Sequence, residues 1–388
     1  MTSSSRMTSL RARLITEIGE LEALSEPWRA LAHTCSCPAA LPGWQLAWWR
    51  HLAPEGAALR AVAVFEDDDR LVGLAPFFVN PGRRVDYRLL GAGITHRLSP
   101  LALPGREREI ASLVARTLAS SSPAPDLVAF EGIDAGSPWP QIFVESWPGW
   151  FRPWRYVSSI HPGPAVDTTG EDFETWLASR SRSFRKQLRV AQRRADEIGA
   201  QVAPVASKEA CEEALLDHRR LHLARWERRG GSSLDERAFA MIAEAVRALV
   251  PTDEMRVFAL RIGQTTIAVQ LALAAGGEVL LLSSGFDDAY ARLSPAHRTV
   301  LAFVESAFAR GERRIDLGGG REEYKFYFAN AAAPLNWVGL VPRSRRYLLT
   351  RVRLAPEQAK WCGQRLARRY LSPAQRSRIK RLLSKTRS

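Results

Sequence analysis

Acidic, basic and phenolic side chains gather after a short apolar segment near residue 316. Residues 313–317 predict a strand, which three glycines and the sequence Arg-Glu-Glu-Tyr-Lys follow at positions 321–325. Glycine lets a ligand approach the backbone closely, and catalytic groups are common on loops that a rigid sheet holds. The cluster can therefore form a site, although spacing alone equally allows a solvated turn. Neither a P-loop nor a dinucleotide fingerprint matches its glycine spacing.

A second candidate is the predicted helix that begins near Ser294. Ser294 is a favourable N-cap and Pro295 a favourable first helical residue. The first turn of a helix offers free N–H groups and a partial positive charge, which suit a pyrophosphate. His297 and Arg298 in this turn oppose the helix dipole, and a bound anion would relieve that conflict. The alternative is an ordinary capped helix with a solvated arginine.

The charge of the chain favours anionic partners. Its 388 residues include 55 Lys and Arg against 41 Asp and Glu, which gives a net charge of +14. The basic residues concentrate at 180–194, at 218–229 and in the tail at 343–388. A solvated helix face is the ordinary explanation of the first segment, but its helical spacing also suits a phosphorylated acceptor or cofactor. The aligned residues are Arg182, Arg185, Lys186, Arg189 and Arg193.

The composition and sequence motifs argue against several classes of protein. No run of about 20 apolar residues is present, and the first residues lack the apolar core of a secretory signal. We therefore expect a cytoplasmic protein. The four cysteines, at 35, 37, 211 and 362, match no zinc or haem spacing, so no metal site is expected. No Gly-x-Ser-x-Gly sequence supports a serine hydrolase.

Residues 1–160 are expected to form a first unit that mixes helices with short strands. The Pro- and Trp-rich residues 137–154 break the pattern, and we place the domain boundary near them. Hydrophobic periodicity and turn residues predict the elements. They are a helix at 43–52, two strands within 59–80 joined by an acidic turn, a strand and loop at 88–104, a helix at 111–119 and a strand at 126–133.

Residues 161–345 are expected to form a second unit, and residues 346–388 a basic helical tail. Short turns between the strands of the second unit predict antiparallel neighbours. The expected elements are a helical segment at 171–199 interrupted near 181–183, helices at 208–229 and 235–249, three strands within 255–287, a helix at 295–310, a strand at 313–317 and a final strand after an aromatic loop.

Four sequence features occur in order between residues 165 and 345. They are the Arg-rich helix, Arg225-Trp226 followed by Gly230, Ser294-Pro295 at a helix start, and Asp-x-x-x-Gly-x-x-x-Tyr-Lys at 316–325. In these features the chain resembles the GNAT-type acyltransferases grouped with bacterial cellulose and exopolysaccharide biosynthesis proteins. That group is distantly related to Fem-type peptidoglycan aminoacyltransferases. Residues 1–160 look like the degenerate GNAT-like half that precedes this domain.

The resemblance implies an α+β fold with tandem GNAT-like domains, each a mostly antiparallel central sheet flanked by helices. It also implies acetyl-CoA or another acyl-CoA as the donor, without a metal. Ala296 stands where many relatives carry Gly, which narrows the approach to the backbone. The implied donor site consists of Ser294, Ala296, His297, Arg298 and Thr299.

GNAT catalysis is direct transfer: the acceptor amine attacks the thioester, a base removes a proton, and an acid protonates the thiolate. We assign the base to Asp316 or Glu322, with Asp287 as a further carboxylate candidate, and the proton donor or orienting group to Tyr324. Trp226 can stack on a sugar or fill the core. The expected substrate contacts are Arg182, Arg185, Lys186, Arg225, Trp226, Gly320 and Lys325.

The sequence thus predicts an acyl-CoA-dependent N-acyltransferase, in particular an acetyltransferase, acting on an amino group of a small-molecule, sugar or polysaccharide precursor. Two alternatives stay open: a Fem-type transferase that uses aminoacyl-tRNA, and a non-catalytic accessory protein of polysaccharide biosynthesis. We expect an anionic acceptor. Nucleic-acid binding has no support from an RNP or helix-turn-helix motif. The basic tail can contact the inner face of a membrane or be an ordinary solvated helix.

Overall fold

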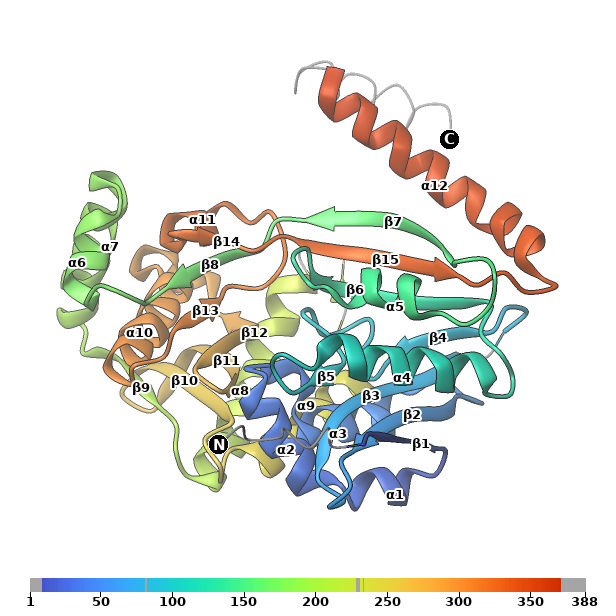
Figure 1. Ribbon diagram of the computed structural model, residues 1–388. Coiled ribbons are helices and arrows are strands. Elements are labelled where there is room, and N and C mark those ends of the chain that lie inside the picture. Colours follow the sequence, from blue (N-terminus) through green and yellow to red (C-terminus); the bar gives the residue numbers. More distant parts are fainter. Residues whose placement is uncertain (1–8, 81, 228–230, 233, 371–388) are drawn as a thin grey trace, which may run out of the picture.

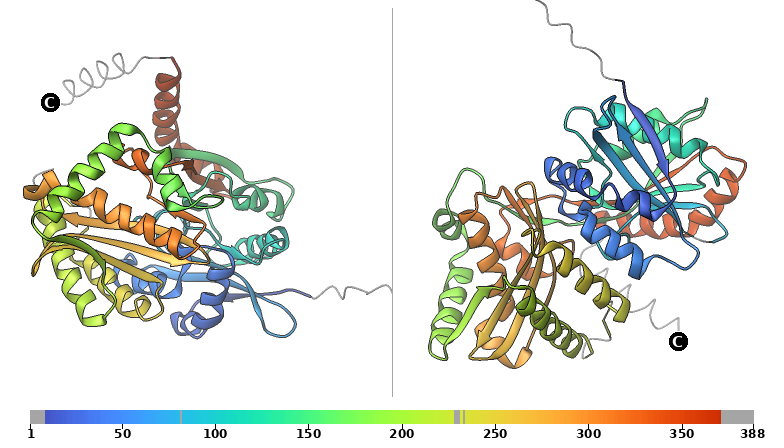
Figure 2. Two further views of the ribbon diagram at one scale, coloured as in Figure 1. Left: turned by 90° about the vertical axis from the view of Figure 1, so that its left-hand side faces the viewer. Right: turned by 90° about the horizontal axis from the view of Figure 1, so that it is seen from below.

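The computed structural model describes residues 9–80, 82–227, 231–232 and 234–370. These residues form two lobes, which the view from below in Figure 2 shows side by side. Each lobe is built on one sheet with helices packed against it (Figure 1). Most neighbouring strands are antiparallel. The expected mixed α/β architecture with two mainly antiparallel sheets is confirmed.

The first sheet has the strand order β1-β2-β3-β4-β6-β15-β7, with β5 paired to β3. The strands are β1 Arg11–Ile15, β2 Ala58–Phe65, β3 Leu71–Asn80, β4 Asp86–Leu89, β5 Leu101–Ala102, β6 Leu127–Asp134, β7 Trp154–His161 and β15 Leu335–Val341. The helices of this lobe are α1 Ile18–Glu22, α2 Ser25–Thr34, η1 Pro38–Ala40, α3 Pro42–Leu52, α4 Glu107–Ser120 and α5 Trp139–Ser146.

Neighbouring residues of β3 show how helices cover both faces of this sheet. Successive side chains of a strand point to opposite faces. Phe77 packs against Phe143 of α5, whereas Phe78 packs against Trp48 of α3. Both phenylalanines are fully buried. The continuous apolar sequence of β3 is therefore explained by helices on both sides of it.

The second sheet has the strand order β14-β8-β13-β12-β11-β10-β9. The strands are β8 Pro164–Asp167, β9 Ala200–Pro204, β10 Met255–Ile262, β11 Thr265–Ala275, β12 Glu278–Phe286, β13 Arg314–Asp316 and β14 Ala331–Ala332. The helices of this lobe are α6 Phe173–Ser179, α7 Arg182–Asp196, α8 Lys208–Glu227, α9 Glu236–Leu249, η2 Asp288–Leu293, α10 Pro295–Ala309 and α11 Glu323–Phe328. Helix α12, Tyr347–Tyr370, follows β15 and packs against β7 and β15 of the first sheet.

The strands β12 and β13 diverge after a short parallel pairing. Only Glu278–Leu280 of β12 pairs with β13, although β12 continues to Phe286. On the other side, β12 pairs with β11 along its whole length, with one register shift. The end of β12 therefore has an open edge towards the residues that follow β13.

The chain returns to the first lobe after the second sheet is complete. Strand β15 pairs with both β6 and β7 of the first sheet. Helix α3 of the first lobe also packs on α9 of the second, and their buried residues share one hydrophobic cluster. The division at residues 160 and 345 stays a prediction, but β15, which it assigns to the second unit, lies in the first sheet.

A buried guanidinium connects the two sheets. Arg97, in the loop after β4, donates to Asp316 of β13, to Asp134 at 2.7 Å and to the carbonyl of Ala333 at 2.9 Å. The Asp316 side chain is 2% exposed. A Cβ on Gly163 would lie 2.0 Å from the Ala333 oxygen, so glycine is required there for this close approach.

Most predicted elements are confirmed, including the helices now labelled α3, α4, α8, α9 and α10 and the break between α6 and α7. The expected irregular stretch at 137–154 is wrong, because it contains α5. Pro140 lies in the first turn of α5, where proline is tolerated. The loop expected after the glycine cluster contains α11. Gly230 and residues 371–388 lie outside the described residues.

We predict that Arg97→Met lowers the free energy of unfolding by about 3–5 kcal/mol, because it leaves the Asp316 charge buried without its main partner. Urea denaturation measures the effect. Arg108→Met is the control, since the Arg108 side chain is 71% exposed in its pair with Glu145 and should cost less than about 1 kcal/mol. Equal losses in the two variants would contradict a connecting role for Arg97.

Candidate active site

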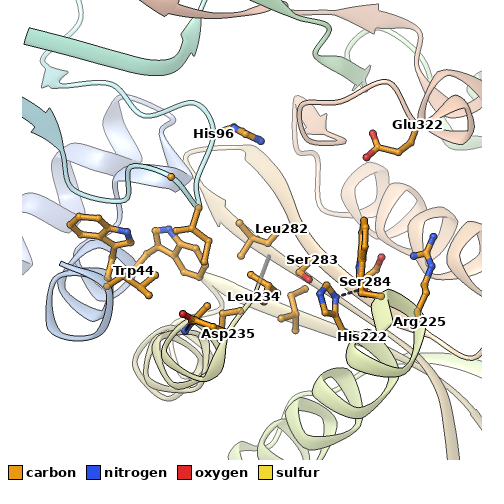
Figure 3. Close-up of a pocket in the computed structure, with 18 of the residues that line it drawn as sticks. Trp44, His96, His222, Arg225, Leu234, Asp235, Leu282, Ser283, Ser284 and Glu322 are labelled. Carbon is orange, nitrogen blue, oxygen red and sulfur yellow. Dashed lines mark hydrogen bonds between the residues drawn. The ribbon is translucent and has the colours of Figure 1, made fainter. Parts of the chain in front are cut away.

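A cavity of ≈ 590 Å³ lies between the lobes at the open edge of β12. Figure 3 shows Trp44 on one side of it, Glu322 and Arg225 on the other, and His96 between them. Both lobes contribute walls: α3 and the loop after β4 come from the first, and β12, α8, α9 and α11 from the second. The lining polar residues include His96, His222, Arg225, Ser283, Ser284, Glu322, Tyr324 and Lys325.

Residues after β13 form a wall with an acid, a phenol and an amine. The Lys325 ammonium is nearly buried and lies 3.2 Å from Glu322 Oε2 and 3.1 Å from the carbonyl of Gly319. Burial, helped by the nearby Glu322 carboxylate, raises the pKa of Tyr324 to about 12. Tyr324 is therefore protonated at neutral pH and can donate a hydrogen bond or a proton.

Gly320 leaves room for the Glu322 carboxylate. It has a φ of +140°, and a Cβ on it would lie 2.1 Å from Glu322 Oε2. An alanine here would therefore displace Glu322 from its position beside Lys325. Gly320 itself supports the site through the backbone and is absent from the cavity lining.

Helix α8 supplies the facing wall. His222 Nε2 lies 2.9 Å from Ser232 Oγ, and burial lowers the pKa of His222, which keeps the ring neutral at neutral pH. The Arg225 guanidinium lies 3.9 Å from the centre of the Phe286 ring, so stacking fixes its orientation. Trp226 is 36% exposed and lines the cavity instead of filling the core, which leaves its face open to a ligand.

The start of α10 lies beside this wall under an aromatic cluster. The His297 ring stacks on Tyr324 with 5.8 Å between ring centres and meets Phe184 of α7 edge-on. Helix α10 begins at Pro295 as predicted, but Ser294 has a left-handed backbone (φ 49°) and its side chain makes no cap bond. The expected side-chain cap is therefore wrong, because this backbone conformation replaces the extended one of a capping serine. Ser294, Ala296 and His297 are half-buried.

Two residues that were predicted to contact the acyl donor form hydrogen bonds within the protein instead. Arg298 is buried and donates to Gln192 Oε1 at 3.2 Å and to the carbonyl of Ala200 at 3.4 Å. Thr299 is buried, and its hydroxyl donates to the carbonyl of Ala296 at 3.1 Å. Neither side chain lines the cavity. Anion binding by the first turn of α10 stays a prediction, which would depend on its free backbone amides. Ser294, Ala296 and His297 are also absent from the cavity lining.

The other predicted residues lie away from the cavity. Asp316 is occupied by Arg97 and by the amide of Gly318, 2.7 Å away. The Asp287 carboxylate caps η2 by accepting from the amide of Ala289 at 2.9 Å. On α7, Arg182 and Lys186 are exposed and Arg185 is half-buried, but none of them is among the lining residues.

Several lining residues were missed by sequence reasoning. Trp44, Trp48 and His96 belong to the first lobe, and no local pattern connects them to the Tyr-Lys motif. His218 and His222 lie four residues apart on the helix that also carries Arg225 and Trp226. Residues at this spacing share a helix face, so that signal was present in the sequence.

Part of the second lobe is similar to a known protein family. Residues 182–326 match the family model described as an acetyltransferase (GNAT) domain. The match extends from α7 to α11 and includes all the predicted site residues. The lining residues Trp44, Trp48 and His96 of the first lobe lie outside it. Residues 182–326 are therefore similar to GNAT acetyltransferase domains. No curated protein matches the chain.

Solved structures support the two-lobed fold. A crystal structure of FemX aligns with a TM-score of 0.61 at 11% identity and covers 87% of this chain and 99% of that chain. The C-terminal domain (DUF2156) of a putative lysylphosphatidylglycerol synthetase from Agrobacterium fabrum gives 0.54 at 11% identity, covering 84% and 94%. L-PGS from Bacillus licheniformis gives 0.52 at 12% identity, covering 88% and 97%. Identities this low establish the fold alone, and the cellulose and exopolysaccharide type stays a prediction.

Among the described residues, no helix has the length and apolarity to cross a membrane. Among the same residues, no group of three or more His, Cys, Asp or Glu could hold a metal ion.

We predict that His218 makes the protein less stable in acid. Its Nε2 lies 3.0 Å from Ser283 Oγ behind the cavity, and burial lowers its pKa from 6.5 to about 3. Between these values the unfolded chain binds a proton that the folded one does not, so the free energy of unfolding rises with pH by up to about 1.4 kcal/mol per unit. In His218→Gln this pH dependence should become weaker by up to about 1.4 kcal/mol per pH unit, because glutamine binds no proton. Urea denaturation between pH 4 and 7 measures it. An unchanged slope would contradict a neutral, buried His218.

Proposed function

We propose that this protein is an N-acyltransferase that uses an acyl-CoA, in particular acetyl-CoA, as donor and a primary amine as acceptor. The observation that carries the proposal is the interlobe cavity, in which Glu322, Tyr324 and Lys325 lie at the open edge of β12 beside the start of α10. The GNAT domain match at 182–326 supports the reaction class. The residues that face this cavity would bind the acceptor.

Glu322 is the proposed proton acceptor. It lines the cavity, its side chain is 57% exposed, and Lys325 orients it. Asp316 was the other candidate, but its charge is compensated by Arg97 away from the cavity. In the proposed reaction, the amine nitrogen attacks the thioester carbonyl, the N–C bond forms, and the C–S bond breaks. The proton lost by the amine passes to Glu322, directly or through water.

Tyr324 is the proposed proton donor to the departing CoA thiolate. Its raised pKa keeps the hydroxyl protonated, and its ring stacks on His297 at the start of α10. The amides of that first turn would hold the CoA diphosphate, since helix N-termini bind phosphate well. The exposed Arg182 and Lys186 of α7 would supply additional positive charge near the phosphates.

Aminoacyl-tRNA is the second candidate donor. The favouring observations are the fold similarity to FemX across 99% of that chain and the exposed basic residues on α7. Such a donor would bring the same kind of activated acyl group to the same cavity. Polysaccharide precursors remain a proposed acceptor class that rests on the resemblance in sequence.

Calorimetry with acetyl-CoA, free CoA and an aminoacyl-tRNA separates the donors. The proposal expects saturable binding of acetyl-CoA and CoA, weakened when Ala296→Arg fills the approach to the first turn of α10. Lys208→Arg on the exposed start of α8 is the control and should leave binding unchanged. If the protein binds aminoacyl-tRNA but neither CoA compound, the donor is aminoacyl-tRNA and not an acyl-CoA.

We predict that Tyr324→Phe lowers kcat by about 10²-fold or more, because it removes the proton donor without removing the ring that stacks on His297. CoA thiol release over a panel of amines measures activity, and calorimetry should show nearly unchanged CoA affinity. The matched control is Tyr327→Phe, one helical turn along α11 and outside the cavity lining. If both phenylalanine variants keep full activity, Tyr324 is not the acid.

A further inference from the structure

Exposed apolar side chains gather where β15 ends and α12 begins. Trp150 and Phe151, in the loop between α5 and β7, are 100% and 70% exposed. Leu348 and Val352, in the first turns of α12, are 75% and 68% exposed. The Arg343 guanidinium lies 5.8 Å from the Phe151 ring centre and 4.3 Å from that of Tyr347. The loop and the helix start therefore form one surface, which we call the α12 patch.

Helix α12 has a second, buried face that holds it to the first sheet. Tyr347 and Leu354 pack with Val341 and Leu127. The Arg351 guanidinium lies 3.8 Å from the ring centre of Trp154 on β7. Because this face is already used, the exposed residues of the α12 patch point away from the protein core.

The exposed face of α12 is apolar along most of its length. Spacings of three and four residues place side chains on one side of a helix. Exposed apolar residues recur at these spacings: Leu348, Val352, Ala355, Ala359, Cys362 and Leu366. Figure 1 shows α12 extending beyond the body of both lobes.

The net charge of the whole chain comes from the segment that contains α12. Residues 343–388 hold 15 of the 55 Lys and Arg but only one of the 41 Asp and Glu. Residues 1–342 hold 40 of each and are neutral overall. Part of this charge lies at the edge of the α12 patch, on the exposed residues Arg343, Arg345 and Arg353.

We propose that the α12 patch docks the protein on an anionic lipid surface. Trp150 and Phe151 would insert at the level of the headgroups, where aromatic rings are favoured. The apolar face of α12 would lie in the interface plane, and its arginines would contact lipid phosphates. An amphipathic helix with an apolar face and basic flanks binds anionic membranes in this way. This inference is independent of the reaction proposed for the cavity.

Other occupants fit the same surface less well. A second copy of the chain would bring two strongly positive segments together. Three of the six exposed apolar positions on this face of α12 are also small residues, which give a weak helix–helix contact. RNA would use the arginines but would leave Leu348 and Val352 without a partner. Lipid alone satisfies both the charge and the apolar side chains.

Vesicle flotation of the full chain tests the proposal. Phosphatidylcholine vesicles with phosphatidylglycerol should bind the protein, and vesicles of phosphatidylcholine alone should not. Added salt should weaken binding. The variants Trp150→Ser with Phe151→Ser, and Leu348→Gln with Val352→Gln, should each reduce the bound fraction about tenfold by removing interfacial apolar area. The matched control is Leu216→Gln, a 70% exposed leucine on α8.

Several results would overturn the proposal. Equal loss of binding in Leu216→Gln and the patch variants would mean that general surface hydrophobicity is responsible. The protein could instead bind a labelled single-stranded RNA tightly and fail to bind vesicles. If the two double variants leave this RNA binding unchanged, the positive charge serves nucleic-acid binding. A concentration-dependent dimer in light scattering that the patch variants abolish would assign the surface to a second copy. Circular dichroism of each variant verifies that it remains folded.

Discussion

The contact between Arg97 and Asp316 joins the two lobes beside their shared hydrophobic cluster. One guanidinium joins the loop after β4, the end of β6, the strand β13 and the segment before β15. An ion pair with so little access to water retains its attraction, but removing either partner leaves a buried charge. The contact lies close in sequence to two walls of the cavity, because His96 precedes Arg97 and the Tyr-Lys segment follows Asp316.

Two carboxylates near the glycine cluster have different environments and therefore different roles. Asp316 is buried, accepts from Arg97 and from the amide of Gly318, and maintains the architecture. Glu322 is largely exposed, lies beside Lys325 and faces the cavity. The surroundings of each carboxylate, and not its residue type, decide whether it has a structural role or is a candidate general base. The same principle applies to Arg298, whose bonds to Gln192 and Ala200 stabilise the packing of α10.

The distribution of charge and apolar surface separates the body of the molecule from α12. The body carries balanced charge, and its cavity combines tryptophan walls with a few polar groups, as small-molecule sites commonly do. Helix α12 combines basic residues with exposed leucine and valine. Because the two regions differ in this way, the proposed chemistry and the proposed docking can be tested independently by mutation.

The sequence by itself determined most elements, the antiparallel strand run, the α10 start and the Tyr-Lys motif, because periodicity, short turns and prolines act locally. It also identified Glu322, Tyr324, Lys325, Arg225 and Trp226, which the structure brings into one cavity. Only tertiary structure showed that Asp316 pairs with Arg97, that Arg298 is buried, and that Trp44 and His96 complete the site. These contacts join residues far apart in the sequence. Whether a charge faces water or another chain segment depends on packing that no local pattern contains.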